Sequence, residues 1–157
     1  MKKLPIGKQE FKGLIEQGCI YVDKTRFLLQ LTDFTAPVFL SRPRRFGKSL
    51  MLNTFKELFK GNKTLFKDTY AYDHWDFEQT NPVIQLDLSK VNGDRPEVIS
   101  DKLLEIVFDA AELMDIELKE TRHPDVALNK LILKVGKTTP VVILIDEYDT
   151  PILENLD

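Results

Sequence analysis

Three adjacent residues, Gly47, Lys48 and Ser49, have the chemistry of a phosphate-binding loop. They follow a short apolar run over 38–41 and precede apolar residues at helical spacing, which is the strand–turn–helix context that such a loop requires. Gly47 lacks a Cβ, so backbone amides can converge on phosphate oxygens, while Lys48 supplies a point charge and the Ser49 hydroxyl can ligate Mg²⁺. The same tripeptide also occurs as a plain helix start after a basic loop, so the segment by itself leaves both interpretations open.

The basic residues before the glycine extend this candidate site. The pattern G-x-x-x-x-G-K-[ST] expects glycine at position 42, where this chain has Arg42, so the turn must open differently, with Pro43 pre-setting part of it. A basic cluster of this kind serves either nucleic-acid contact or the neutralisation of a nucleoside triphosphate, and we favour the second use. The residues expected to contact the nucleotide are Arg44, Arg45, Phe46, Gly47, Lys48, Ser49 and Leu50.

Two acidic residues end the longest strongly apolar run of the chain. Val141–Ile145 is followed by Asp146 and Glu147, as in the Walker B strands that give P-loop proteins their magnesium partner. We expect Asp146 to hold Mg²⁺ through its water shell, together with Ser49, and Glu147 to orient or deprotonate the attacking water, with Lys48 as the second catalytic residue. A buried strand that ends in two solvated acids is the alternative. Because the two motifs are independent and occur in the expected order, together they predict binding of a nucleoside triphosphate.

Alternating strand and helix patterns position these motifs. Helices are expected over 10–17, 23–31, 48–60 with a stop at Gly61, 94–115 with a capping box at Asp94 and Glu97, and 124–135. Strands are expected over 38–41, 82–88 and 140–145, with a shorter β-prone run over 19–22 and an aromatic loop over 62–81 that packs on the core. Continuous apolar strands between amphipathic helices indicate a mostly parallel sheet covered on both faces, so the predicted fold class is α/β.

The composition narrows the class of protein. The chain has 157 residues, the length of one ordinary domain, and a net charge of −3. This charge argues against a generally basic nucleic-acid binder, and 43% hydrophobic with 30% charged residues is a globular composition. No apolar run is long enough to cross a membrane, no secretory signal is visible, and Cys19 is the only cysteine, so we expect a cytoplasmic location.

Four stretches of the sequence together resemble the bacterial AAA-ATPase-like domain family. They are LPIG at 4–7, YVDKT at 21–25, FLSRPRRFGKS at 39–49 and IDEYD at 145–149, and the resemblance covers essentially the whole chain, 1–157. In that family an arginine at the position of Arg42 is the usual form. The Walker residues that carry over are Lys48, Ser49, Asp146 and Glu147. Asp23 and Lys24 match a family motif to which the sequence assigns no role.

The resemblance implies a three-layer P-loop NTPase sheet that uses ATP and Mg²⁺, in proteins that usually continue into a C-terminal PD-(D/E)XK nuclease-like domain. The chain ends at Asp157, soon after the acidic strand end, so we expect an N-terminal portion whose sheet is incomplete at the C-terminus. A nuclease-like domain or a second polypeptide is the expected partner that completes it. Hydrolysis is therefore expected of the full-length form. The alternative is a fragment that binds nucleotide or a partner chain without turnover, or a module that regulates a nuclease-like domain.

Overall fold

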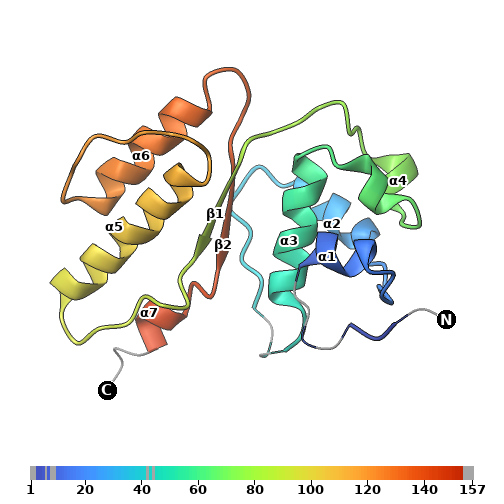
Figure 1. The fold of residues 1–157 in the computed structure, drawn as a ribbon, viewed down its shortest axis with the longest axis horizontal. Coiled ribbons are helices and arrows are strands. Elements are labelled where there is room, and N and C mark those ends of the chain that lie inside the picture. The colour runs from blue at the N-terminus through green and yellow to red at the C-terminus, as the bar shows by residue number, and fades with distance from the viewer. Residues whose placement is uncertain (1–2, 6, 8–9, 42, 44, 154–157) are drawn as a thin grey trace. The chain divides into compact units, whose positions relative to one another are not determined.

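The chain divides into two compact units, residues 1–80 and residues 81–157. The computed structural model describes residues 3–5, 7, 10–41, 43 and 45–153. The elements of the first unit are α1 (Phe11–Glu16), α2 (Thr25–Thr32), α3 (Lys48–Phe59), the short 3₁₀ helix η1 (Lys63–Phe66) and α4 (Ala71–His74). Those of the second unit are β1 (Val83–Asp87), α5 (Pro96–Glu112), α6 (Pro124–Val135), β2 (Val142–Asp146) and α7 (Thr150–Leu153) (Figure 1).

Aromatic rings form the core of the first unit. Phe11 on α1 and Phe66 in η1 are fully buried with their ring centroids 4.9 Å apart, and the Phe66 ring lies 5.3 Å from that of Phe77. Leu58 of α3 is also fully buried. These contacts confirm that the aromatic segment over 62–81 packs on the core. The expectation of a loop there is corrected, because η1 and α4 lie within it and bury Phe66 and Ala71.

Gly61 ends α3 at the predicted position and allows a close approach of two backbone segments. Its φ is +74°, in the left-handed region that favours glycine. A Cβ at this position would lie 2.7 Å from the carbonyl oxygen of Phe77 and 2.7 Å from Cγ2 of Thr80. The glycine therefore both terminates the helix and admits the chain that returns beside it.

The first turn of α2 is tied to the start of α4. Asp23 Oδ1 accepts the N–H of Thr25 at 2.8 Å, and its Oδ2 accepts the N–H of Tyr70 at 2.7 Å. The fully buried Thr25 completes the connection, since its Oγ1 accepts the N–H of Ala71 at 3.0 Å. The 21–25 motif therefore fixes a segment that is 46 or 47 residues away in the sequence.

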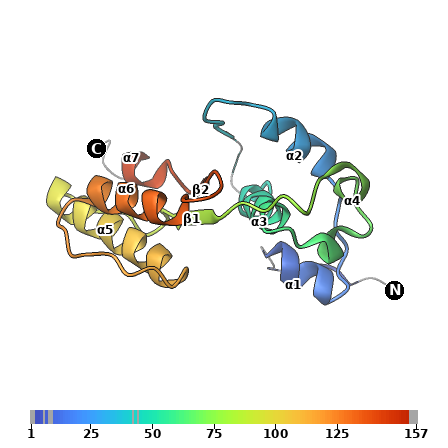
Figure 2. The same ribbon diagram turned by 90° about the horizontal axis from the view of Figure 1, so that it is seen from above.

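A parallel strand pair with two helices on one face makes up the second unit. β1 and β2 pair in register from Val83 opposite Val142 to Asp87 opposite Asp146. Helices α5 and α6 lie side by side in Figures 1 and 2, and their buried residues pack with those of β1. The buried cluster consists of Ile84, Leu86, Val107, Ala110, Ala111, Ala127 and Leu131. This arrangement agrees with the α/β class, and among the described residues the sheet contains two strands.

The strand expected over 38–41 is not part of that sheet. The segment belongs to neither β1 nor β2, and Val38 and Phe39 are 48% and 77% exposed. The physical reason is that a strand is stabilised by lateral pairing, which a short apolar run does not supply by itself. Within the described part of the chain, the β-prone run over 19–22 likewise forms one isolated bridge, between Cys19 and Lys3.

The start of α5 also differs from the prediction. Its N-cap is Arg95, without a side-chain capping bond, so the capping box expected from Asp94 does not form. Pro96 instead opens the helix, because its fixed φ suits the first helical position and its missing N–H is not needed there. Across the described ranges, no helix has both the length and the apolar character that crossing a bilayer would demand.

Candidate functional site

A tight turn leads into the N-terminus of α3 in the first unit. Residues 45–47 form the turn, and Gly47 has a φ of 76° as the N-cap of the helix, which has no side-chain capping bond. The left-handed geometry is one that glycine adopts without steric cost. Arg42 and Arg44, two of the basic residues of the predicted loop, lie outside the described residues.

The first turn of α3 presents the groups that bind an anion. Met51 N–H donates to Gly47 O at 3.0 Å, so the amides of Ser49 and Leu50 lie before the first bond of the helix and have no acceptor one turn earlier. The helix has 12 residues, and the positive end of its dipole is at this turn. Lys48, Ser49 and Leu50 are half-buried. The turn thus combines amides, a cation and a hydroxyl, the donor set that phosphate requires.

Arg45 adopts an unusual backbone conformation in this turn. Its φ is 68°, which costs a residue with a Cβ about 1–2 kcal/mol relative to ordinary geometry. Arg45 and Phe46 are exposed, and Phe46 is 62% exposed as a residue. The turn therefore directs a cationic residue and an aromatic residue outward, just ahead of the helix.

The acidic strand end lies in the second unit. Asp146 is the last residue of β2 and is 9% exposed, with its main-chain oxygen accepting the N–H of Leu88 at 3.0 Å. Its Oδ1 accepts the N–H of Glu147 at 3.0 Å, and Glu147 has a φ of 50°. The strand end thus places one carboxylate in a largely buried position and turns the chain sharply at the next acidic residue.

Two further carboxylates near this strand end were not identified from the sequence as site residues. Asp87 lies opposite Asp146 in the register, which places both at the carboxyl ends of neighbouring parallel strands. Asp149 has a buried Oδ1 with no hydrogen-bond partner among the described residues. The signal for Asp87 was available, because it also ends an apolar strand. Buried carboxylate oxygen without a donor suits a hard cation such as Mg²⁺.

The donor chemistry at the predicted metal residues fits magnesium. Ser49 offers a hydroxyl and Asp146 a carboxylate, and Mg²⁺ prefers a few oxygen ligands together with water and substrate phosphates. Within the described part of the chain, no group of three or more His, Cys, Asp or Glu side chains converges as a metal site.

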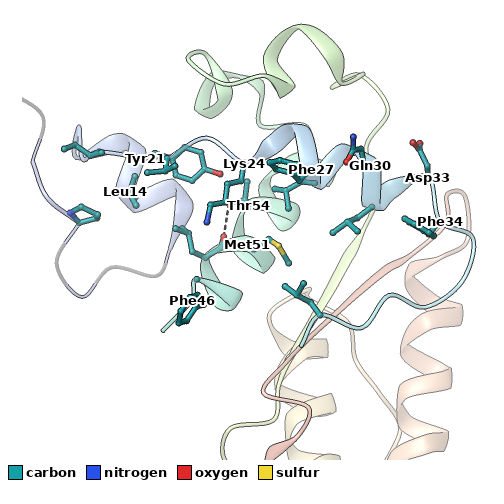
Figure 3. Close-up of a pocket in the computed structure, with 18 residues that line it drawn as sticks. Leu14, Tyr21, Lys24, Phe27, Gln30, Asp33, Phe34, Phe46, Met51 and Thr54 are labelled. Carbon is teal, nitrogen blue, oxygen red and sulfur yellow. Dashed lines mark hydrogen bonds between the residues drawn. The ribbon is translucent and has the colours of Figure 1, made fainter. Parts of the chain in front are cut away.

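A large cavity adjoins the turn within the first unit. It has a volume of about 810 Å³ and is mainly apolar. Its walls come from the 20–24 segment, α2 and α3, and Figure 3 shows the lining side chains. Phe46, Gly47 and Leu50 line it, so the cavity and the predicted phosphate loop share residues.

Tyr21 and Thr54 both line this cavity. Thr54 is fully buried and donates its hydroxyl to the Leu50 carbonyl oxygen at 2.8 Å, the dashed line in Figure 3. Burial raises the pKa of Tyr21, the Asp23 carboxylate raises that pKa further, and a hydrogen bond with Thr54 acts in the opposite direction. The phenol is therefore held in its neutral form against the apolar wall.

The site residues predicted from the sequence are divided between the two units. The turn brings Arg45, Phe46 and Gly47 together with the start of α3, beside the cavity. Asp146 and Glu147 are adjacent at the end of β2 in the second unit. Sequence reasoning missed the cavity-lining residues Lys24 and Phe27, although the 21–25 motif was a signal for the first of them.

Comparisons with known proteins match the chain along almost its entire length. The family model described as "Predicted AAA-ATPase" matches residues 5–157. Among curated proteins, the chain is similar to an uncharacterized protein in the vnfD 5′ region of Azotobacter chroococcum mcd 1, with 39% identity over 158 residues. That alignment covers 99% of this chain and 30% of the relative, so the chain spans less than a third of the relative's length. No solved structure matches the chain.

Proposed function

We propose an ATP-binding function on the premise that the chain belongs to the predicted AAA-ATPase family, whose model covers residues 5–157. The observation that carries the proposal is the turn before α3, where a left-handed Gly47 precedes helix amides that have no earlier acceptor in the helix. This backbone arrangement is the one that phosphate groups select. We propose hydrolysis of ATP with Mg²⁺ for a full-length form of the protein.

The loop residues have distinct roles in this proposal. Lys48 neutralises the β- and γ-phosphates, and the amides of Ser49 and Leu50 donate to phosphate oxygens. Arg44 and Arg45 add positive charge, and Phe46 and Gly47 complete the loop around the phosphates. The side chains thereby fix the γ-phosphate in one orientation, which supplies much of the catalysis in phosphoryl transfer.

The acidic strand end supplies the remaining groups. Ser49 and Asp146 are proposed to hold Mg²⁺, which when bound neutralises charge that develops on the phosphate oxygens. Glu147 accepts a proton from water as the water oxygen bonds to the γ-phosphorus. The bond from that phosphorus to the β–γ bridging oxygen breaks in the same process, so ADP and phosphate leave.

An alternative function is nucleotide binding or partner binding without turnover, including regulation of a nuclease-like domain. One observation favours it: within the described residues the sheet has two strands, and residues 38–41 belong to neither. Positioning a water against the γ-phosphate demands a rigid framework on both sides of the nucleotide. Binding demands only the loop.

Calorimetric titration with MgATP tests the proposed function. We expect binding by the folded chain and a loss of affinity of about tenfold to a hundredfold in Lys48→Ala, because charged hydrogen bonds contribute about 1.5–3 kcal/mol. Lys60→Ala is the matched control, since Lys60 is an exposed lysine at the other end of the same helix. Absence of binding to a folded sample would overturn the proposal.

Phosphate release by the full-length protein separates the two functions. Release that Lys48→Ala abolishes and Lys60→Ala preserves supports an ATPase. Nucleotide binding without any release supports the non-catalytic alternative.

A further inference from the structure

We propose that the cavity of the first unit holds the base and ribose of the nucleotide whose phosphates lie on the loop at residues 45–50. The inference rests on the proposed function and adds a second subsite to it. The cavity is the one bounded by α2, α3 and the 20–24 segment. It gives a role to residues that the phosphate loop does not use.

Continuity with the loop is the first argument. Phe46 and Gly47 of the turn and Leu50 of α3 line the cavity, so the loop forms part of its wall. A nucleotide with phosphates at the amides of Ser49 and Leu50 must direct its remaining atoms into the adjoining space. The cavity volume of about 810 Å³ lies within the range of about 300–1,000 Å³ that is usual for small-molecule sites.

The chemistry of the walls is the second argument. Phe27 and Phe34 on the cavity are 64% and 63% exposed, although large apolar rings are usually buried. Leu31, Leu40 and Met51 add apolar surface beside them. A nucleobase has two apolar faces that stack on aromatic rings, so these walls match a base and not a second phosphate.

The distribution of charge gives the ligand a direction. Lys24 and Asp33 both line the cavity, at opposite ends of α2, and nine residues at 1.5 Å each separate them by about 13 Å. In Figure 3, Gln30, Asp33 and Phe34 lie at the end of α2 away from Phe46. The Asp33 carboxylate would repel phosphates but accepts a hydrogen bond from the exocyclic amine of a base. The phosphates therefore lie at the Phe46 end and the base edge at the Asp33 end.

Paired titrations with MgATP and magnesium tripolyphosphate test this subsite. Tripolyphosphate has the phosphates and lacks the nucleoside, so it reports the loop alone. We expect Phe27→Ala to weaken MgATP binding about tenfold, the lower part of the range for base stacking on an aromatic ring, and to leave tripolyphosphate affinity within about twofold. Phe39→Ala is the matched control, because Phe39 is an exposed phenylalanine of the same unit that does not line the cavity.

The possible outcomes distinguish this inference from the proposed function. If Phe27→Ala binds MgATP as tightly as the unaltered chain while Lys48→Ala does not, the subsite is wrong and the phosphate loop stands. If Phe27→Ala lowers the affinity for MgATP and for tripolyphosphate equally, the subsite is also wrong, because the substitution then acts through the loop. If the unaltered chain binds neither ligand, the proposed function fails and the subsite fails with it. Phe34→Ala serves as the second variant if circular dichroism shows that Phe27→Ala does not fold.

Discussion

Replacing Asp23 tests whether the 21–25 motif stabilises the first unit. Its carboxylate accepts the N–H of Thr25 at 2.8 Å and the N–H of Tyr70 at 2.7 Å. Hydrogen bonds to a charged group contribute about 1.5–3 kcal/mol each, and the Tyr70 bond is exposed, so water replaces part of it after substitution. We expect Asp23→Ala to lower the free energy of unfolding by about 2 kcal/mol. Asp23→Asn retains one acceptor oxygen and should lose about half as much.

Urea unfolding followed by tryptophan fluorescence measures this change in unfolding free energy in the first unit. Trp75 is the only tryptophan of the chain, and it directly follows α4, whose start the Asp23 bond fixes. Its ring packs edge-on against Phe59 with centroids 5.4 Å apart, so its emission reports the packing of the first unit. Asp68→Ala, at an exposed aspartate of the same unit, is the control and should change stability by less than about 0.5 kcal/mol.

Two results would refute the reasoning on Asp23. One is a loss of stability in Asp23→Ala that does not exceed the loss in Asp68→Ala. The other is an equal loss in the alanine and asparagine variants, because it would show that the second acceptor oxygen contributes nothing.

Two further predictions concern Gly61 and Tyr21. Gly61→Ala should lower the free energy of unfolding of the first unit by about 2–4 kcal/mol in urea, because Gly61 has a positive φ and an added Cβ would lie 2.7 Å from the carbonyl oxygen of Phe77. Gly13→Ala within α1 is the control and should raise that free energy by about 0.5–1 kcal/mol. Equal effects of the two substitutions would contradict the argument. The raised pKa of Tyr21 means that the folded state favours the neutral phenol. The contribution of this preference to the free energy of unfolding is therefore complete below the unfolded pKa near 10 and is lost as pH rises through the folded pKa. The stability difference between the unaltered chain and Tyr21→Phe should therefore shrink at alkaline pH, and a constant difference across pH 8–11 would be inconsistent with it.

The helices were largely predictable because their ends are marked by local chemistry. Residues 124–135 were expected as a helix and form α6 over Pro124–Val135, with proline at the start and Gly136 at the end. The apolar stripe of α3 likewise located its span, and Gly61 its end. These signals act over a few residues, so the sequence contains them in full.

Features that depend on distant contacts were not predictable in the same way. The apolar run over 38–41 has the composition of a strand, but pairing with another segment decides whether a strand forms. Asp23 accepts an N–H from a residue 47 positions away, which no local pattern could indicate. The cavity beside the loop is lined both by residues of the 20–24 segment and α2 and by residues of α3, which lies far from them in the sequence, so its aromatic walls were also not visible in the motif.

Two strained backbone positions among the described residues fall within the two predicted motifs. Among the residues that the structure describes, three other than glycine have a positive φ: Arg45, Asp115 and Glu147. Asp115 closely follows α5, at a helix end where left-handed geometry is common. Arg45 and Glu147 instead occupy the predicted phosphate loop and the predicted water-activating position, at a cost of about 1–2 kcal/mol each. Such strain concentrates at functional sites because the surrounding structure holds a side chain where its chemistry is needed. Arg45 and Glu147 therefore occupy positions where glycine would adopt the same backbone conformation at lower energy. This is the expected pattern if the arginine and glutamate side chains act on a ligand.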